Sequence, residues 1–145
     1  MGLTIYSNGD EYHFDMSYGS FFRLRAQVAT LLNEEFGKTY NSMRGFHTAD
    51  EYAAIDKKLD EIADFEQLDE AILTFLYTSD CDGVINYKTC KKLYELIKDI
   101  YVGDIMCSYK YKGRDTYYVH GDEAFDAFKD FLKRCYSKHR YMRWS

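Results

Sequence analysis

The sequence of 145 residues has no proline, and no apolar run approaches the roughly 20 residues that a membrane-spanning helix needs. Residues 1–4 are not a basic segment followed by an apolar one, so no secretory leader is predicted. None of the four cysteines belongs to a Cys-x-x-Cys pair, which argues against zinc-ribbon and thioredoxin-like sites. Cysteines without a leader are typical of reduced thiols. We therefore expect a soluble, cytoplasmic protein that does not associate with a membrane.

The sequence also lacks the motifs of common enzymes. It contains no G-x-x-x-x-G-K or G-x-G-x-x-G phosphate loop and no H-E-x-x-H zinc motif. The four histidines are scattered, and none is expected to form a metal pair with a residue four positions later. We therefore expect no catalytic residue and no bound cofactor, and a protein that acts by binding rather than as an enzyme.

Aromatic residues, in contrast, are abundant, since the chain has 15 Tyr and 10 Phe. Hydrophobic residues make up 46% and charged residues 30%, which are the proportions of a folded domain rather than of a disordered chain. The length suits one domain with its own core, and no linker or internal repeat divides the chain. We expect residues 1–145 to form a single compact domain.

Hydrophobic periodicity predicts two β-hairpins with helices between and after them. Alternation around Asn8-Gly9 predicts the first hairpin, and alternation on both sides of Gly113 predicts the second. Three- and four-residue spacing predicts four to five helices. They are expected to begin near Ser20, Ala49, Asp64, Tyr87 and Asp122. This order is typical of an α+β fold, and the two hairpins are expected to join in one antiparallel sheet because a lone hairpin is marginal in water.

Polar residues and glycines predict where some helices begin and end. Thr48 and Glu51 have the spacing of a capping box. Gly37 is predicted to be the C-terminal cap of the first helix, with a loop after it. Phe65 is placed on the buried stripe of the helix that begins at Asp64.

Residues 78–89 lie between two expected helices and have the pattern of an ion-binding loop. Asp80, Asp82 and Asn86 fall at positions 3, 5 and 9, and Gly83 falls at position 6, where a sharp turn is needed. The segment therefore resembles the loop of an EF-hand. The resemblance implies a helix-loop-helix module that offers oxygen ligands to calcium.

The same loop departs from the EF-hand pattern at both ends. Thr78 and Thr89 occupy positions 1 and 12, where the family has carboxylates. We therefore expect the shape of the loop to persist without the ion, or calcium binding to be weak. The ligands that the resemblance implies are Asp80, Asp82 and Asn86. The Ser-Asp-Cys-Asp-Gly run is also similar to one in small uncharacterised proteins of bacteria and their phages, which implies no activity.

Aromatic and basic residues alternate in the second hairpin and recur in the C-terminal tail. The candidate binding residues are Tyr109, Lys110, Tyr111, Lys112, Arg114, Tyr117, Tyr118, Arg140, Arg143 and Trp144. Tyr, Trp and Arg are the residue types that anchor protein interfaces. The same types can stack bases and hold phosphates, but the net charge of -5 opposes tight binding to a long duplex.

Negative charge is concentrated between Asp50 and Glu70, where nine acidic residues stand against two lysines. A small acidic protein can occupy a basic groove on a partner, including one meant for nucleic acid. We therefore predict an adaptor or inhibitor that acts through protein–protein association, a general profile shared by phage counter-defence proteins. The alternatives are a nucleotide or nucleic-acid binding module and a weak calcium-binding module.

Overall fold

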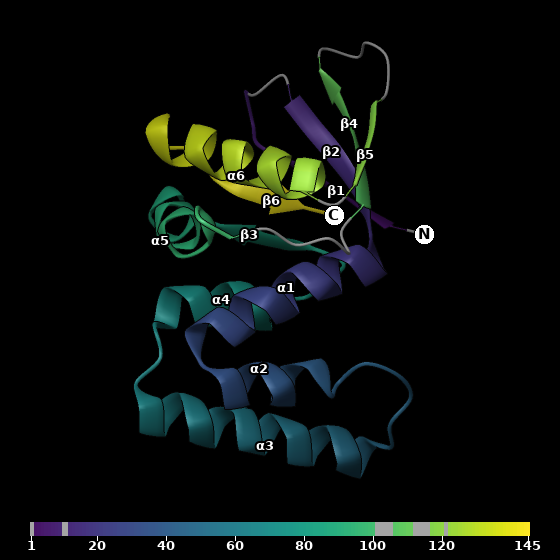
Figure 1. Ribbon diagram of the computed structural model, residues 1–145, viewed down its shortest axis with the longest axis vertical. Helices are drawn as coiled ribbons and strands as arrows, with labels where there is room; N and C mark the ends of the chain where they lie inside the picture. Colours follow the sequence, from purple (N-terminus) through teal and green to yellow (C-terminus); the bar gives the residue numbers. More distant parts are fainter. Residues whose placement is uncertain (1, 10–11, 101–105, 112–116, 121) are drawn as a thin grey trace.

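The computed structural model describes residues 2–9, 12–100, 106–111, 117–120 and 122–145 (Figure 1). The strands within these ranges are β1 (Gly2–Tyr6), β2 (Tyr12–Ser17), β3 (Gly83–Ile85), β4 (Met106–Tyr111), β5 (Tyr117–His120) and β6 (Met142–Trp144). The helices are α1 (Tyr18–Leu32), α2 (Glu34–Asn41), α3 (Ala49–Glu66), α4 (Glu70–Tyr77), α5 (Tyr87–Ile97) and α6 (Asp122–Ser137). This composition confirms the α+β prediction.

The described strands form one antiparallel sheet in the order β3-β6-β1-β2-β4-β5. The two predicted hairpins, β1–β2 and β4–β5, join through β2 and β4, as expected from the marginal stability of a lone hairpin. The sequence did not predict β3 and β6, which have three residues each and are too short to show alternation. Strand β6 pairs with β1 on one side and β3 on the other.

The helices continue away from the sheet in successive layers (Figure 1). Helices α5 and α6 pack side by side, α1 packs on α2, and α2 packs on α3. Helix α3 is therefore the outermost element, at the end of the molecule opposite β4 and β5. No described helix is long and apolar enough to cross a membrane.

Trp144 is a core residue, so its prediction as a surface contact was wrong. Its side chain is 0% exposed, and its ring lies 5.5 Å from that of Phe21 and 5.8 Å from that of Phe75. The reason is the alternation of a strand, which buries Met142 and Trp144 and leaves Arg143 half-buried. The indole therefore packs in the protein's own core and is not available to a partner.

The first helical region divides where the sequence predicted one helix. Helix α1 ends at Leu32, and the side chain of Asn33 caps α2 by accepting a hydrogen bond from the backbone N–H of Phe36 at 2.9 Å. Gly37 is not a C-terminal cap, because it lies inside α2 where α1 passes closely. A β-carbon there would overlap Thr30, so the residue must be glycine for the two helices to approach.

Helix α3 is longer than predicted. It continues past Asp64 to Glu66 and ends at Gln67, whose φ of 50° is left-handed. Asp69 then caps α4. This boundary moves Phe65 from a predicted buried stripe to the exposed end of α3, where its side chain is 86% exposed.

Candidate functional site

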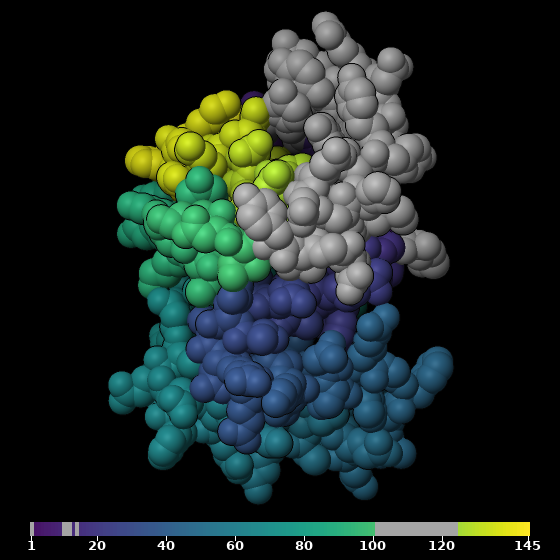
Figure 2. All heavy atoms as spheres, viewed as in Figure 1, coloured from purple at the N-terminus to yellow at the C-terminus, as the bar shows by residue number. Residues whose placement is uncertain are grey.

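The loop between α2 and α3 presents a phenylalanine to solvent. Phe46 is fully exposed, and it precedes the outermost helix by only a few residues. The blue and teal lower end of the molecule in Figure 2 contains α2 and α3. A large apolar side chain in such a position is a candidate contact for a partner.

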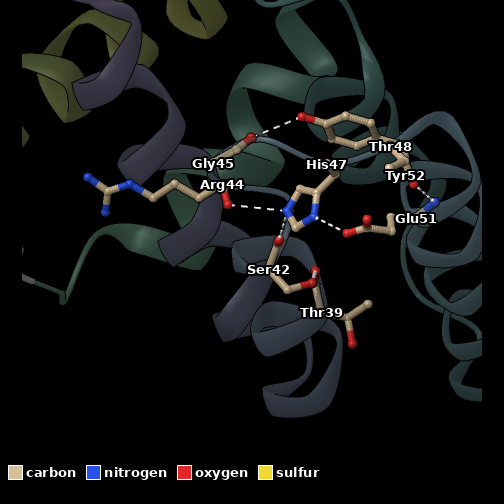
Figure 3. Close-up of polar contacts among 8 residues, drawn as sticks. All are labelled: Thr39, Ser42, Arg44, Gly45, His47, Thr48, Glu51 and Tyr52. Carbon is tan, nitrogen blue, oxygen red and sulfur yellow. Dashed lines mark hydrogen bonds and ion pairs between the residues drawn. The ribbon is translucent and has the colours of Figure 1, made fainter.

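The side chain of His47 holds this loop in place (Figure 3). Its Nε2 lies 2.8 Å from the carbonyl oxygen of Ser42 and 3.3 Å from that of Arg44. Its Nδ1 lies 3.0 Å from the carboxylate of Glu51 on the first turn of α3. One ring therefore links the end of α2, the loop and the start of α3.

This geometry selects the protonated form of His47. A carbonyl or carboxylate oxygen only accepts hydrogen bonds, so both ring nitrogens must donate for all three contacts to form. The hydrogen bond to Glu51 raises the pKa of His47, and the carbonyl oxygens of Ser42 and Arg44 act in the same direction. The same contact, with the help of Thr48, lowers the pKa of Glu51.

Further contacts complete the turn beside Phe46. The hydroxyl of Tyr52 donates a hydrogen bond to the carbonyl of Gly45 at 3.0 Å, and its ring meets that of His47 edge-on. Gly45 has a φ of 97°, a backbone conformation that residues other than glycine rarely adopt. The predicted cap is confirmed, since the Glu51 N–H donates to the Thr48 hydroxyl at 3.2 Å.

The spacing that reveals this cluster was present in the sequence but was misjudged. His47 and Glu51 are four residues apart, which places them on neighbouring turns. That spacing was interpreted only in terms of a metal pair, whereas the two side chains form an ion pair. No sequence pattern indicated that Phe46 is exposed, because Phe46 does not belong to any run of periodically spaced apolar residues.

Helix α3 carries a strong negative charge next to the loop. It has seven acidic residues and two lysines, and within it only Leu59 and Ala63 are buried. Its field reaches α4, where burial, together with the carboxylates of Asp60 and Asp56, raises the pKa of Tyr77 to about 12. The helix is therefore an acidic, mostly exposed surface.

Phe65 is the second exposed aromatic side chain of this region. It lies near the C-terminal end of α3, whereas Phe46 lies before its N-terminal end. The 18 residues of α3 span about 27 Å at a rise of 1.5 Å per residue. Two apolar anchors therefore lie at opposite ends of the acidic helix. We call Phe46, Phe65 and the acidic residues of α3 the acidic docking surface.

The EF-hand-like loop is held from inside the fold. The carbonyl oxygen of Ser79 accepts hydrogen bonds from the indole of Trp144 at 2.8 Å and from the buried guanidinium of Arg25 at 3.5 Å. Asp80 and Asp82 are exposed. Asn86 caps α5 by accepting from the backbone N–H of Thr89 at 2.9 Å.

These contacts join the loop to the core and to the start of α5. In the described part of the chain, no group of three or more His, Cys, Asp or Glu side chains is placed to hold a metal ion. The cap at the start of α5 occupies the amide oxygen of Asn86, which is one of the three implied ligands. Calcium binding at this loop stays a prediction.

The strand pairing of β4 and β5 gives the positions of the residues in the predicted hairpin surface. Tyr109 lies opposite Tyr117, and Tyr118 lies opposite Ser108. Lys110 and Tyr111 lie opposite His13 and Tyr12 of β2. Lys112 and Arg114 lie outside the described residues. The hairpin is at the opposite end of the molecule from α3, and its contact role stays a prediction.

The predicted contact residues of the C-terminal tail differ in exposure. Arg140 and Arg143 are half-buried, and the guanidinium of Arg143 lies 5.9 Å from the ring centroid of the exposed Tyr141. With Trp144 in the core, the tail keeps Arg140 and Arg143 as candidate contacts but not the indole.

Comparison of the chain with models of protein families, with curated proteins and with solved structures finds no match.

Proposed function

We propose that this protein acts by binding another protein, as an adaptor or inhibitor rather than an enzyme. The observation that carries the proposal is Phe46, a fully exposed aromatic side chain on a loop fixed by the His47 and Tyr52 hydrogen bonds. A partner that receives Phe46 orders little of this loop on binding, and such preorganisation favours affinity.

The charge of α3 indicates the kind of partner. Seven acidic residues on one exposed helix attract a basic surface and speed its encounter with the acidic docking surface. Asp64 and Glu66 lie in the last helical turn, where the helix dipole disfavours negative charge. A basic partner offsets that cost, so the acidic helix suits a basic groove, including one built for nucleic acid. Such an inhibitor would act in the cytoplasm, as a phage counter-defence protein does.

The proposal is tested by photo-crosslinking from the docking surface. A benzophenone-bearing amino acid replaces Phe46 in the full chain, which is irradiated in a nuclease-treated host-cell lysate. The control carries the same group at Lys133, an exposed position on α6. We expect a basic protein to be crosslinked from position 46 and not from position 133.

Alanine variants then test whether that partner depends on the two anchors. We expect F46A/F65A to lose the complex while its melting temperature stays unchanged, because both side chains are exposed. We also expect the association rate to fall as salt rises, since screening weakens attraction between exposed charges. A partner that F46A/F65A retains in full, or a complex that nuclease removes, would overturn the proposal.

A further inference from the structure

A groove of about 900 Å³ lies between the start of α4, the outer face of α5 and the end of α6. Tyr87, Lys88 and Lys91 line it from α5, and Tyr136 and His139 line it from the end of α6 and the turn after it. Its apolar lining comes from Ile72 and Leu96. The volume is in the range of pockets that hold small molecules. It lies apart from the acidic docking surface, which is formed by α3 and the loop before it.

A stacked pair of rings forms one part of this groove. The rings of Tyr87 and His139 are 4.4 Å apart between centroids and nearly parallel, at 20°. His139 is exposed and has a left-handed φ of 54°, in a turn after α6 where glycine is the usual residue. A histidine in this conformation costs free energy relative to glycine. Its ring contact with Tyr87 offsets that cost and provides a flat platform.

The charges around the groove leave a positive excess. Lys88, Lys91, Lys92 and Glu95 follow the spacing of one helix face. Both acids that line the groove have a lysine partner: Asp69 contacts Lys92 at 2.9 Å, and Glu95 contacts Lys98 at 3.1 Å. Lys88 and Lys91 form no ion pair with any residue in the described ranges. An anion in the groove would neutralise them.

We propose that this groove binds a small phosphate-bearing aromatic molecule of the mononucleotide class. Lys88 and Lys91 bind the phosphate, because ammonium groups three residues apart on a helix can reach one anion together. The Tyr87–His139 platform stacks the base, whose π-face needs no sequence-specific contact. Ile72 and Leu96 exclude water beside the ring. The net charge of -5 opposes binding of a longer polyanion, so the site suits one nucleotide better than a nucleic acid strand.

The test is an amide NMR titration of the full chain with AMP, with adenosine and inorganic phosphate as separate arms. We expect AMP to shift the amide signals of α5 and of the turn at His139 in a saturable way. We expect K88A/K91A to weaken AMP binding at least tenfold. The matched control is K57A/K58A, which removes two exposed lysines from α3. We expect it to leave the affinity unchanged.

A second variant isolates the ring platform. Glycine adopts a left-handed φ without strain, so H139G keeps the turn while it removes the ring. We expect H139G to retain phosphate binding and to lose the additional affinity that AMP has over phosphate. The proposal is wrong if AMP shifts no groove amide at millimolar concentration, if K57A/K58A weakens it as much as K88A/K91A, or if only an oligonucleotide binds.

Discussion

The indole N–H of Trp144 donates a 2.8 Å hydrogen bond to the backbone carbonyl of Ser79, 65 residues earlier in the chain. The contact connects the last strand to the start of the EF-hand-like loop. The same ring packs against Gly83 at the start of β3, where a β-carbon would overlap it. The position of the loop is therefore fixed by its contacts with a core side chain.

Replacing Trp144 by phenylalanine tests this connection. W144F keeps most of the aromatic packing but removes the donor, which leaves the Ser79 carbonyl with the longer bond from Arg25. We expect the free energy of unfolding to fall by about 1–3 kcal/mol, because the variant loses a hydrogen bond worth about 1 kcal/mol and its smaller ring fills less of the core. Denaturant unfolding measures it.

The control for W144F is Y141F on the neighbouring exposed tyrosine. Tyr141 is 55% exposed, so we expect its change to stay within about 0.5 kcal/mol. Equal stability of W144F and the unchanged protein would show that the Ser79 contact does not hold the loop.

The His47–Glu51 pair makes the loop between α2 and α3 sensitive to pH. Since the folded state raises the pKa of His47, its contribution to stability is complete below the ordinary value of 6.5 and is lost as pH rises through the raised pKa. Since the folded state lowers the pKa of Glu51, its contribution is complete above 4.5 and is lost as pH falls through the lowered pKa. The loop is therefore held best between pH 4.5 and 6.5.

The variant E51Q tests this pair by NMR titration of the His47 ring. We expect its pKa to fall, because the glutamine carries no charge to favour the imidazolium. The control E61Q removes an equal charge farther along α3, beside Lys57, and should change the pKa of His47 little. An unchanged value in E51Q, or equal changes in both variants, would contradict the arrangement in Figure 3.

The fold class could be predicted because long periodic segments and an Asn-Gly turn are local features. The two hairpins and the caps at Thr48 and Asn86 depend on neighbouring residues. The joining of the hairpins through β2 and β4 is a long-range contact, and it was expected because a lone hairpin is marginal in water. Strand β6 could not be predicted in this way, because three residues become a strand only when β1 and β3 lie beside them. The burial of Trp144 follows from that distant pairing.

Helix boundaries were the other source of error, and they determined the candidate site. Asp64 has the character of a helix cap, so Phe65 was placed on a buried stripe, whereas α3 continues to Glu66. Similarly, Gly37 was interpreted as a cap although its role is to let α1 approach. The site around Phe46 depends on a loop conformation, and only the His47–Glu51 spacing could have indicated it.

The EF-hand-like loop leads to a prediction on calcium. Only two carboxylates, Asp80 and Asp82, replace the larger charged set of the family, and the Asn86 side chain caps α5. We expect the melting temperature to be the same in calcium and in a chelator, because an ion that binds the folded state would raise it. A calcium-dependent rise that D80N/D82N abolishes would contradict this and make the loop an ion site.

Tyr77 provides a measure of the acidic field of α3. Burial, together with the carboxylates of Asp60 and Asp56, raises its pKa from 10.0 to about 12. Because the unfolded chain ionises at the lower value, the free energy of unfolding should decrease as pH rises from 10.0 toward 12. Carbon NMR of the tyrosine rings follows the titration.

We expect D60N to lower the pKa of Tyr77 more than E61Q does, because Glu61 is not among the groups that raise it. If Tyr77 titrates near 10.0, or if both variants act equally, then α3 does not carry the focused negative field on which attraction of a basic partner depends.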